Sequence, residues 1–216
     1  MKQKAIEFIK DNKIIVIVRG VAKDSLLKTA EAMYEGGIRL IEITYDAKGI
    51  VKNEETAEMI SLLDNHFKGD MLIGAGTVLT PEQVRLTKEA GGKYIISPDT
   101  FTDVIKETVK EGLISMPGAM TPSEAQAAFR EGADFVKLFP IDNLGISYAK
   151  AIMAPLSHIP FLAVGGVDEN NIKDYLNIGI SGFGIGSSIV KKDLISAGKF
   201  NEITELAKKY VNAIKE

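Results

Sequence analysis

The sequence contains no cysteine and only two histidines, His66 and His158, among its 216 residues. The absence of cysteine excludes disulfides, thiolate nucleophiles, cysteine-based zinc sites and iron–sulfur clusters within the chain. Two histidines also argue against a histidine-rich metal site. We therefore expect chemistry without a metal ion, carried by lysine, glutamate, serine, threonine and backbone groups.

Long apolar runs and clusters of basic charge are missing as well. No run approaches the ~20 apolar residues of a membrane-spanning helix, and the charged segment 1–13 lacks the apolar stretch of a secretory signal. The chain has 26 Lys and Arg against 29 Asp and Glu, a net charge of −3, without the concentrated basic face that nucleic-acid binding requires. These absences predict a cytoplasmic protein with no membrane and no nucleic-acid partner.

The apolar residues that are present alternate between short β-branched runs and longer amphipathic stretches. We expect eight strands, at Ile14–Val18, Leu40–Thr44, Leu72–Gly76, Tyr94–Ser97, Leu113–Met116, Phe135–Leu138, Phe161–Val164 and Gly182–Ile185. We expect helices between and after them, at Ser25–Glu35, Thr56–Asn65, Pro81–Ala90, Thr102–Glu111, Pro122–Arg130, Ser147–Ala154, Glu169–Asn177 and Phe200–Ile214.

This order of elements predicts an α/β fold, a single (β/α)8 TIM barrel over residues 1–216. An extra N-terminal helix, at Gln3–Asp11, is expected to cover the bottom of the barrel. An open doubly wound sheet is the alternative. The count of eight strands and the lack of a G-x-G-x-x-G turn favour the barrel.

Lys137 is charged where a barrel strand is expected to be apolar on both faces. It lies near the C-terminal end of its strand, which is where barrel enzymes keep their active sites. Apolar neighbours lower the pKa of a lysine, and a neutral amine can attack a carbonyl and form a Schiff base. A lysine whose ammonium reaches solvent is the alternative.

Glu42 is the second charged residue within a strand, and the alternation in Leu40–Thr44 places it on the face opposite the isoleucines. If the isoleucines meet the helices, Glu42 points into the barrel as a candidate general acid or base. A buried structural ion pair is the alternative.

Arg19, at the end of the first strand, could clamp a carboxylate or phosphate, or pair with Glu42 instead. Thr77 follows glycines that would let a ligand approach the backbone.

Glycines follow the seventh and eighth strands, in the segments Val164–Val167 and Phe183–Ser188. Loops of this kind, with a serine pair that opens a short helical turn, are typical of phosphate sites in barrels because their N–H groups face the anion. We therefore favour phosphate binding here. Glycines that only shape tight loops are the alternative.

Seven motifs run through essentially the whole chain: GGIRLIEIT at 36–44, IGAGTVL at 73–79, ISP at 96–98, MPG at 116–118, VKLFP at 136–140, GGV at 165–167 and GIGS at 184–187. In this order and spacing they resemble the KDPG/KHG aldolase family. Its members cleave 2-keto-3-deoxy-6-phosphogluconate (KDPG) or 4-hydroxy-2-oxoglutarate (KHG) to pyruvate and an aldehyde.

The resemblance implies a class I aldolase that requires no metal and no cofactor, and whose substrate is a phosphorylated 2-keto acid. Lys137 would form a Schiff base with the C2 carbonyl of the substrate, and Glu42 would move protons. Family members are usually trimers, so a homotrimer is expected. The resemblance implies that Arg19 and Thr77 contact the carboxylate of the substrate, and that Pro98 and Phe139 form the pocket wall. It implies that the phosphate contacts are Gly165, Gly166, Gly186 and Ser187.

The sequence departs from the family pattern at two places. Many members carry an Arg shortly after the second strand, whereas here Thr44 precedes Tyr45–Lys48, so that basic contact is missing or moved to Lys48. Many also have Thr where this chain has Val164, and Val-Gly-Gly resembles 2-dehydro-3-deoxy-6-phosphogalactonate aldolases, which differ in the C4 configuration.

Two other functions compete with the aldolase. A phosphosugar isomerase or epimerase would use Glu42 as its base, but it leaves Lys137 without a purpose. A non-catalytic barrel that binds a phosphorylated metabolite would gain nothing from burying both groups, since doing so costs stability.

Overall fold

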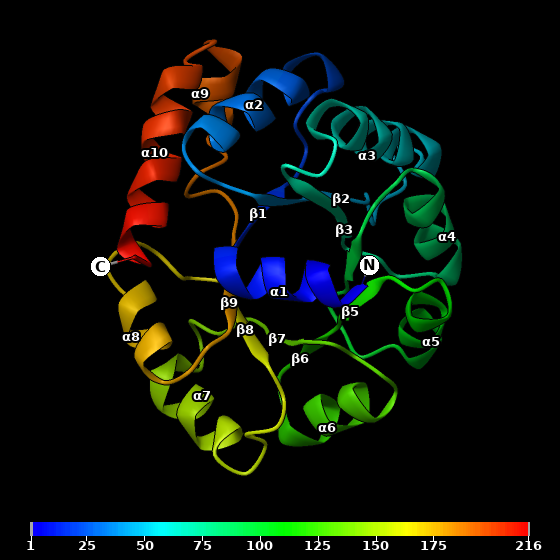
Figure 1. Ribbon diagram of the computed structural model, residues 1–216, viewed down its shortest axis with the longest axis vertical. Coiled ribbons are helices and arrows are strands. Elements are labelled where there is room, and N and C mark those ends of the chain that lie inside the picture. Colours follow the sequence, from blue (N-terminus) through cyan, green and yellow to red (C-terminus); the bar gives the residue numbers. More distant parts are fainter. Residues whose placement is uncertain (1, 216) are drawn as a thin grey trace.

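Figure 1 shows the computed structural model, which describes residues 2–215, as a ring of helices around a central sheet. The strands follow the order β5-β4-β3-β2-β1-β9-β8-β7-β6, and the paired neighbours run parallel. The two strands at the ends of this order are consecutive in the chain, so the sheet curls into a nearly closed barrel. The predicted barrel is confirmed, and the open doubly wound sheet is wrong.

The strands begin and end close to the predicted residues. Five agree residue for residue, and three are one residue shorter at one end. Their bounds are β1 Ile14–Val18, β2 Leu40–Thr44, β3 Leu72–Gly76, β4 Tyr94–Ile96, β5 Ile114–Met116, β6 Gly118–Ala119, β7 Val136–Leu138, β8 Phe161–Val164 and β9 Gly182–Ile185.

The additional strand, β6, closes the barrel between β4 and β7. β5 pairs with β4, whereas β6 pairs with β7. Pro117 separates the two because proline has no N–H to donate to a strand ladder. Its carbonyl still accepts a hydrogen bond from the backbone N–H of Lys137, with an N···O distance of 2.9 Å. Two residues are too short to show a period, which is why β6 is not predicted.

Helices α2 to α8 follow one another around the barrel, and α9 and α10 lie between α8 and α2 (Figure 1). Their bounds are α1 Lys2–Asn12, α2 Lys23–Glu35, α3 Asn53–Phe67, α4 Pro81–Glu89, α5 Thr102–Lys110, α6 Pro122–Arg130, α7 Gly145–Met153, α8 Ile172–Asn177, α9 Lys192–Ser196 and α10 Phe200–Ala213. Helix α9 is not predicted. No helix within residues 2–215 is long and apolar enough to cross a membrane.

Helix α8 begins three residues later than predicted because polar side chains organise a turn in front of it. Oδ1 of Asp168 accepts hydrogen bonds from the backbone N–H groups of Asn170 (2.8 Å) and Asn171 (3.1 Å). In return, Oδ1 of Asn171 accepts from the N–H of Asp168 at 2.9 Å. Such Asx turns offer the backbone an alternative to the helix.

Helix α1 covers the bottom of the barrel, as predicted, and lies across its centre in Figure 1. Ile9 of this helix packs into an inner core built from the first inward-facing residues of the strands, among them Leu40, Leu72, Phe135 and Leu162. A larger outer core joins the other strand faces to the surrounding helices. With the bottom filled in this way, the open end for a ligand is the C-terminal end of the strands.

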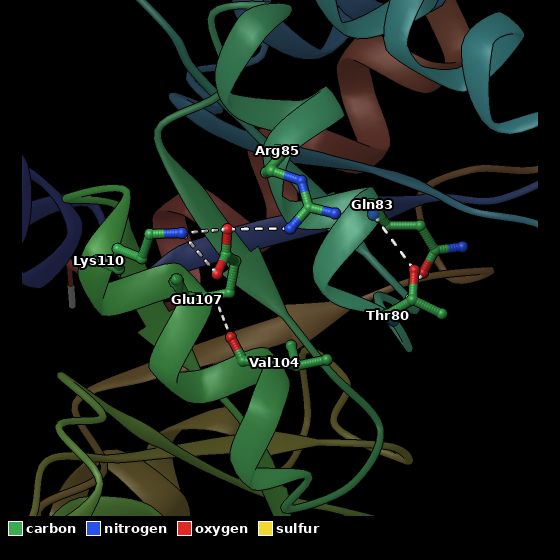
Figure 2. A network of polar contacts seen from close by, with 7 residues as sticks. Thr80, Gln83, Arg85, Val104, Glu107 and Lys110 are labelled. Carbon is green, nitrogen blue, oxygen red and sulfur yellow. Dashed lines mark hydrogen bonds and ion pairs between the residues drawn. The ribbon is translucent and has the colours of Figure 1, made fainter.

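Helices α4 and α6 each begin with a threonine at the N-cap that is followed by a proline. Oγ1 of Thr80 accepts from the N–H of Gln83 at 3.3 Å, and Oε1 of Gln83 accepts from the N–H of Thr80 at 3.2 Å (Figure 2). Thr121 and Glu124 form the same reciprocal capping box. Each box satisfies two donors that the first turn of a helix leaves without partners.

Figure 2 also shows an ion-pair network that joins the neighbouring helices α4 and α5. Oε1 of Glu107 accepts hydrogen bonds from Nη1 of Arg85 and from Nζ of Lys110, both at 3.1 Å. Arg85 and Lys110 are exposed, so this network lies on the surface and contributes little to stability.

Candidate active site

Lys137 points from β7 into the barrel. Its neighbours Val136 and Leu138 belong to the outer core, so the alternation of the strand turns Lys137 inward. The residue is only 7% exposed, and Nζ lies 4.5 Å from the ring centroid of Phe139. The alternative of a lysine that reaches solvent is therefore wrong. Burial lowers the pKa of Lys137, which Glu42 raises in part, and a lowered pKa favours the nucleophilic neutral amine.

Glu42 lies inside the barrel on β2, as the alternation predicts, because Ile41 and Ile43 face the outer core. It is 2% exposed, and its Oε2 atom has no protein hydrogen-bond partner. Burial raises the pKa of Glu42 to about 7, against the lowering effects of Lys137 and Arg19. A carboxyl with such a pKa can both give and take a proton near neutral pH, as a general acid–base catalyst must. A satisfied structural ion pair would be expected to engage Oε2.

The interior therefore holds an acid whose pKa is raised and an amine whose pKa is lowered. Glu42 and Lys137 each act on the pKa of the other, and Arg19 acts on both. Because desolvation is the largest cause in each case, both groups are held closer to their neutral forms than in water. Titratable groups whose environments shift them in this way mark candidate catalytic pairs.

Two inward-facing glycines of β3 make room for this pair. A Cβ atom on Gly76 would lie 2.2 Å from Oε1 of Glu42, and one on Gly74 would lie 2.2 Å from the ring of Tyr94. Tyr94 is fully buried, its hydroxyl donates to the carbonyl of Ile41 at 2.5 Å, and Glu42 contributes to the raised pKa of Tyr94. Tyr94 thus forms the floor beneath Glu42. The sequence analysis does not identify it, because a tyrosine at the start of a strand reads as ordinary core.

Arg19 and Thr77 meet at the mouth of the barrel, above β1 and β3. Nη2 of Arg19 donates to Oγ1 of Thr77 at 2.9 Å. Thr77 adopts a left-handed φ of 54°, which is strained for a β-branched residue. The backbone turns Thr77 out of the line of β3, and its hydroxyl and the guanidinium together form a polar edge beside Glu42.

A cavity of about 730 Å³ opens at this end of the barrel and includes most of the predicted ligand contacts. Its lining includes six of them, namely Arg19, Phe139, Gly165, Gly166, Gly186 and Ser187. Val164 also lines it and lies above Gly184, where a Cβ would come within 2.8 Å of Cγ2 of the valine. The position at which relatives carry a hydroxyl is therefore an apolar part of the cavity wall.

Left-handed glycines shape the loop after β8, and a helical turn shapes the loop after β9. Gly165 and Gly166 both have left-handed φ values, 94° and 74°, and a Cβ on Gly166 would lie 2.1 Å from Cβ of Asp142. After β9, the carbonyl of Gly186 accepts from the N–H groups of Ile189 and Val190, which forms the predicted helical turn.

Lys137, Glu42, Thr77 and Pro98 are not among the residues that line this cavity. Pro98 follows β4, and its carbonyl oxygen lies 2.3 Å from the position that a Cβ atom on Gly118 would occupy. Tyr45 turns away from the mouth, and its hydroxyl bonds to α4 at Gln83 and Thr87. Lys48 lines a separate cavity of about 470 Å³, which Arg19 shares. Among residues 2–215 there is no cluster of three His, Cys, Asp or Glu side chains suited to a metal ion.

A parallel barrel with a buried lysine and glutamate below an open cavity defines the class of α/β-barrel enzymes. The sequence profile of the KDPG and KHG aldolases matches residues 5–206. The chain therefore belongs to the KDPG and KHG aldolase family and is a carbon–carbon lyase.

Individual relatives agree with this assignment. The 2-dehydro-3-deoxy-6-phosphogalactonate aldolase of Escherichia coli is 34% identical over 94% of this chain and 95% of its own. The 2-dehydro-3-deoxy-phosphogluconate aldolase of Haemophilus influenzae is 32% identical over 99% of this chain and 98% of its own. The structure of a Legionella pneumophila KDPG aldolase, with pyruvate captured as a covalent carbinolamine intermediate, superposes with a TM-score of 0.84. Its sequence is 29% identical, and the match covers 94% of this chain and 96% of that one.

Proposed function

We propose that this aldolase cleaves a phosphorylated 2-keto-3-deoxy sugar acid to pyruvate and a phosphorylated aldehyde, through a Schiff base on Lys137. One observation carries the proposal: Lys137 and Glu42 are buried in the same barrel interior with pKa values shifted toward neutrality. The covalent pyruvate adduct of the Legionella pneumophila relative supports it.

In this mechanism the neutral Nζ of Lys137 attacks the C2 carbonyl and forms a carbinolamine. Glu42 gives a proton to the departing hydroxyl, and loss of water leaves a protonated imine. Glu42, now a carboxylate, takes the proton of the C4 hydroxyl while the C3–C4 bond breaks and its electrons move into the imine. The aldehyde leaves, C3 of the resulting enamine is protonated, and hydrolysis releases pyruvate and the free amine.

The substrate would lie across the mouth of the barrel. The polar edge formed by Arg19 and Thr77 suits the carboxylate next to C2, and Phe139 covers the amine of Lys137. The loops at Gly165–Gly166 and Gly186–Ser187 line the far part of the cavity, where a distal phosphate would accept from backbone N–H groups. Pro98 stays a predicted wall residue.

Three classes of substrate are candidates: 2-keto-3-deoxy-6-phosphogluconate, its galactonate epimer and 4-hydroxy-2-oxoglutarate. They are candidates because relatives of similar identity act on different sugar acids. We expect the phosphorylated six-carbon acids to be preferred, since the cavity extends to both glycine loops. Cleavage rates on both C4 epimers and on 4-hydroxy-2-oxoglutarate decide the question. Val164→Thr tests whether the missing hydroxyl sets the choice of substrate.

The homotrimer also stays a prediction, which sedimentation velocity can test.

Borohydride reduction in the presence of pyruvate tests the Schiff base directly. We expect a reduced pyruvyl adduct on the peptide that contains Lys137, and no adduct in Lys137→Ala. Lys106→Ala, which removes an exposed lysine paired with Glu131, is the matched control and should keep the adduct. Folded wild-type protein without an adduct would reject the imine mechanism in favour of an isomerase, an epimerase or a non-catalytic barrel.

A further inference from the structure

The charged side chains that line the 730 Å³ cavity are nearly balanced in sign. Arg19, Lys191 and Lys192 are the cations, and Asp168 and Asp193 are the anions. A phosphate monoester carries nearly two negative charges at neutral pH, and backbone dipoles alone add no net charge to offset them. The cavity therefore needs a cation that is free to face the phosphate.

Two of these charged groups are engaged elsewhere. Arg19 donates to Thr77 beside Glu42, at the end of the cavity assigned to the carboxylate of the substrate. Asp168 accepts from two backbone N–H groups in the turn before α8. Lys191 also lines a second cavity of about 550 Å³, in which the acids Asp193, Glu202 and Glu205 outnumber the one other base, Lys209.

Lys192 differs from these groups in where its ammonium lies. Although it belongs to α9, Nζ is 2.9 Å from the position that a Cβ atom on Gly20 would occupy. Gly20 directly follows Arg19 in the loop after β1 and lines the 470 Å³ cavity, of which Arg19 is also a wall residue. The side chain thus reaches from the loop after β9 to the loop after β1, and Gly20 leaves the space in which the ammonium sits.

We propose that Lys192 binds the distal phosphate and is the residue that gives this enzyme its preference for phosphorylated over unphosphorylated substrates. The proposal rests on the proposed function for its substrate class. The ammonium supplies three N–H donors and a full positive charge, which complement the N–H groups of the glycine loops. Sequence alone does not show this role, because Gly20 and Lys192 are brought together only by the closure of β1 onto β9.

Binding of inorganic phosphate, measured by isothermal titration calorimetry, tests the proposal without any turnover. Lys192→Met removes the charge and keeps the length, and it should raise the Kd for phosphate roughly tenfold or more. Lys192→Arg keeps the charge and should stay close to wild type. Lys199→Met removes an equal charge from a lysine that pairs with Glu202 outside this cavity, and it should leave the Kd unchanged.

Kinetics give the second arm of the test. With Lys192→Met, KM for the phosphorylated 2-keto-3-deoxy acid should rise by a similar factor. KM for the same acid without phosphate should change less than about twofold, because that acid lacks the phosphate and its carboxylate lies at Arg19 and Thr77. Raised ionic strength should weaken wild-type binding of phosphate more than that of the variant.

The outcomes separate this inference from the proposed function. If wild-type protein does not bind phosphate, or if Lys192→Met binds it as tightly, the role of Lys192 is overturned. If phosphate binding depends on Lys192 but no pyruvyl adduct forms, the inference stands and the Schiff-base proposal fails.

Discussion

The carboxyl group of Glu42 occupies the space that a side chain on Gly76 would fill. A Cβ atom there would lie 2.2 Å from Oε1 and 2.5 Å from Cδ, distances that no two unbonded atoms of these kinds tolerate. Gly76 is the last residue of β3, the strand that pairs with β2. The neighbouring strand thus gives Glu42 its position through a missing side chain, without any hydrogen bond from Gly76.

Gly76→Ala should therefore displace the carboxyl group of Glu42. We expect the rate of aldol cleavage to fall about 100-fold, because a shift of roughly 1 Å in a catalytic group costs about that factor. The measurement is kcat/KM for the best substrate of the panel, together with circular dichroism to confirm that the variant is folded.

A double-mutant cycle separates this effect from a general loss of packing. Aspartate at position 42 is one methylene shorter, so Gly76→Ala should cost less in the Glu42→Asp background than in wild type. Gly92→Ala is the control for packing, because its Cβ would meet Thr87 of α4 on the outside of the barrel and not the carboxyl group. Equal costs of Gly76→Ala in both backgrounds would contradict the positioning role.

The exchange of the pyruvate methyl protons with deuterium, followed by NMR, isolates the proton transfer by Glu42. Enamine formation on Lys137 requires a base, so exchange should accelerate as the pH rises through about 7, where the pKa of Glu42 lies. In Glu42→Gln this limb of the pH profile should disappear along with most of the rate. A limb that persists in the variant with the same midpoint would assign it to another group.

The arrangement of strands and the direction of their side chains follow from local pattern. Period-two alternation predicts that Glu42 faces inward, because the isoleucines on either side of it can be buried only against helices. Local pattern also marks some helix ends: Gly91 and Gly132, which follow α4 and α6, have left-handed φ values of 90° and 100°, which are typical of the residue after a helix.

Features that depend on contacts between distant segments escape such an analysis. The space that Gly76 leaves for Glu42 depends on the register of β2 against β3. The place of Lys192 depends on β1 meeting β9 across the closed barrel. Pro98 was assigned by family resemblance, and the structure places it against Gly118 and away from the cavity lining. The motifs thus predict the residues of the proposed reaction, whereas tertiary pairing determines which groups surround them.

The capping box of α6 gives a prediction on stability alone. Oε2 of Glu124 accepts from the N–H of Thr121 at 2.8 Å, and Oγ1 of Thr121 accepts from the N–H of Glu124 at 3.3 Å. Thr121→Ala removes the second bond and also the hydrogen bond that Oγ1 donates to Oε2 of Glu124 at 2.9 Å. It should lower the free energy of unfolding by about 1 kcal/mol in urea titrations. Thr121→Ser keeps an oxygen at this position and should recover most of the loss.

The buried carboxyl of Glu42 should also make the stability of the fold depend on pH. Its pKa is raised from 4.5 to about 7 in the folded state, so between these values the folded protein holds a proton that the unfolded chain has released. The free energy of unfolding then falls as the pH rises, by up to about 3 kcal/mol over the interval from this group alone. Glu42→Gln cannot titrate at this position, so its stability relative to wild type should increase from pH 5 to pH 8. Urea titrations at both values measure the difference, and a constant difference would mean that the pKa of Glu42 is the same in the folded and unfolded states.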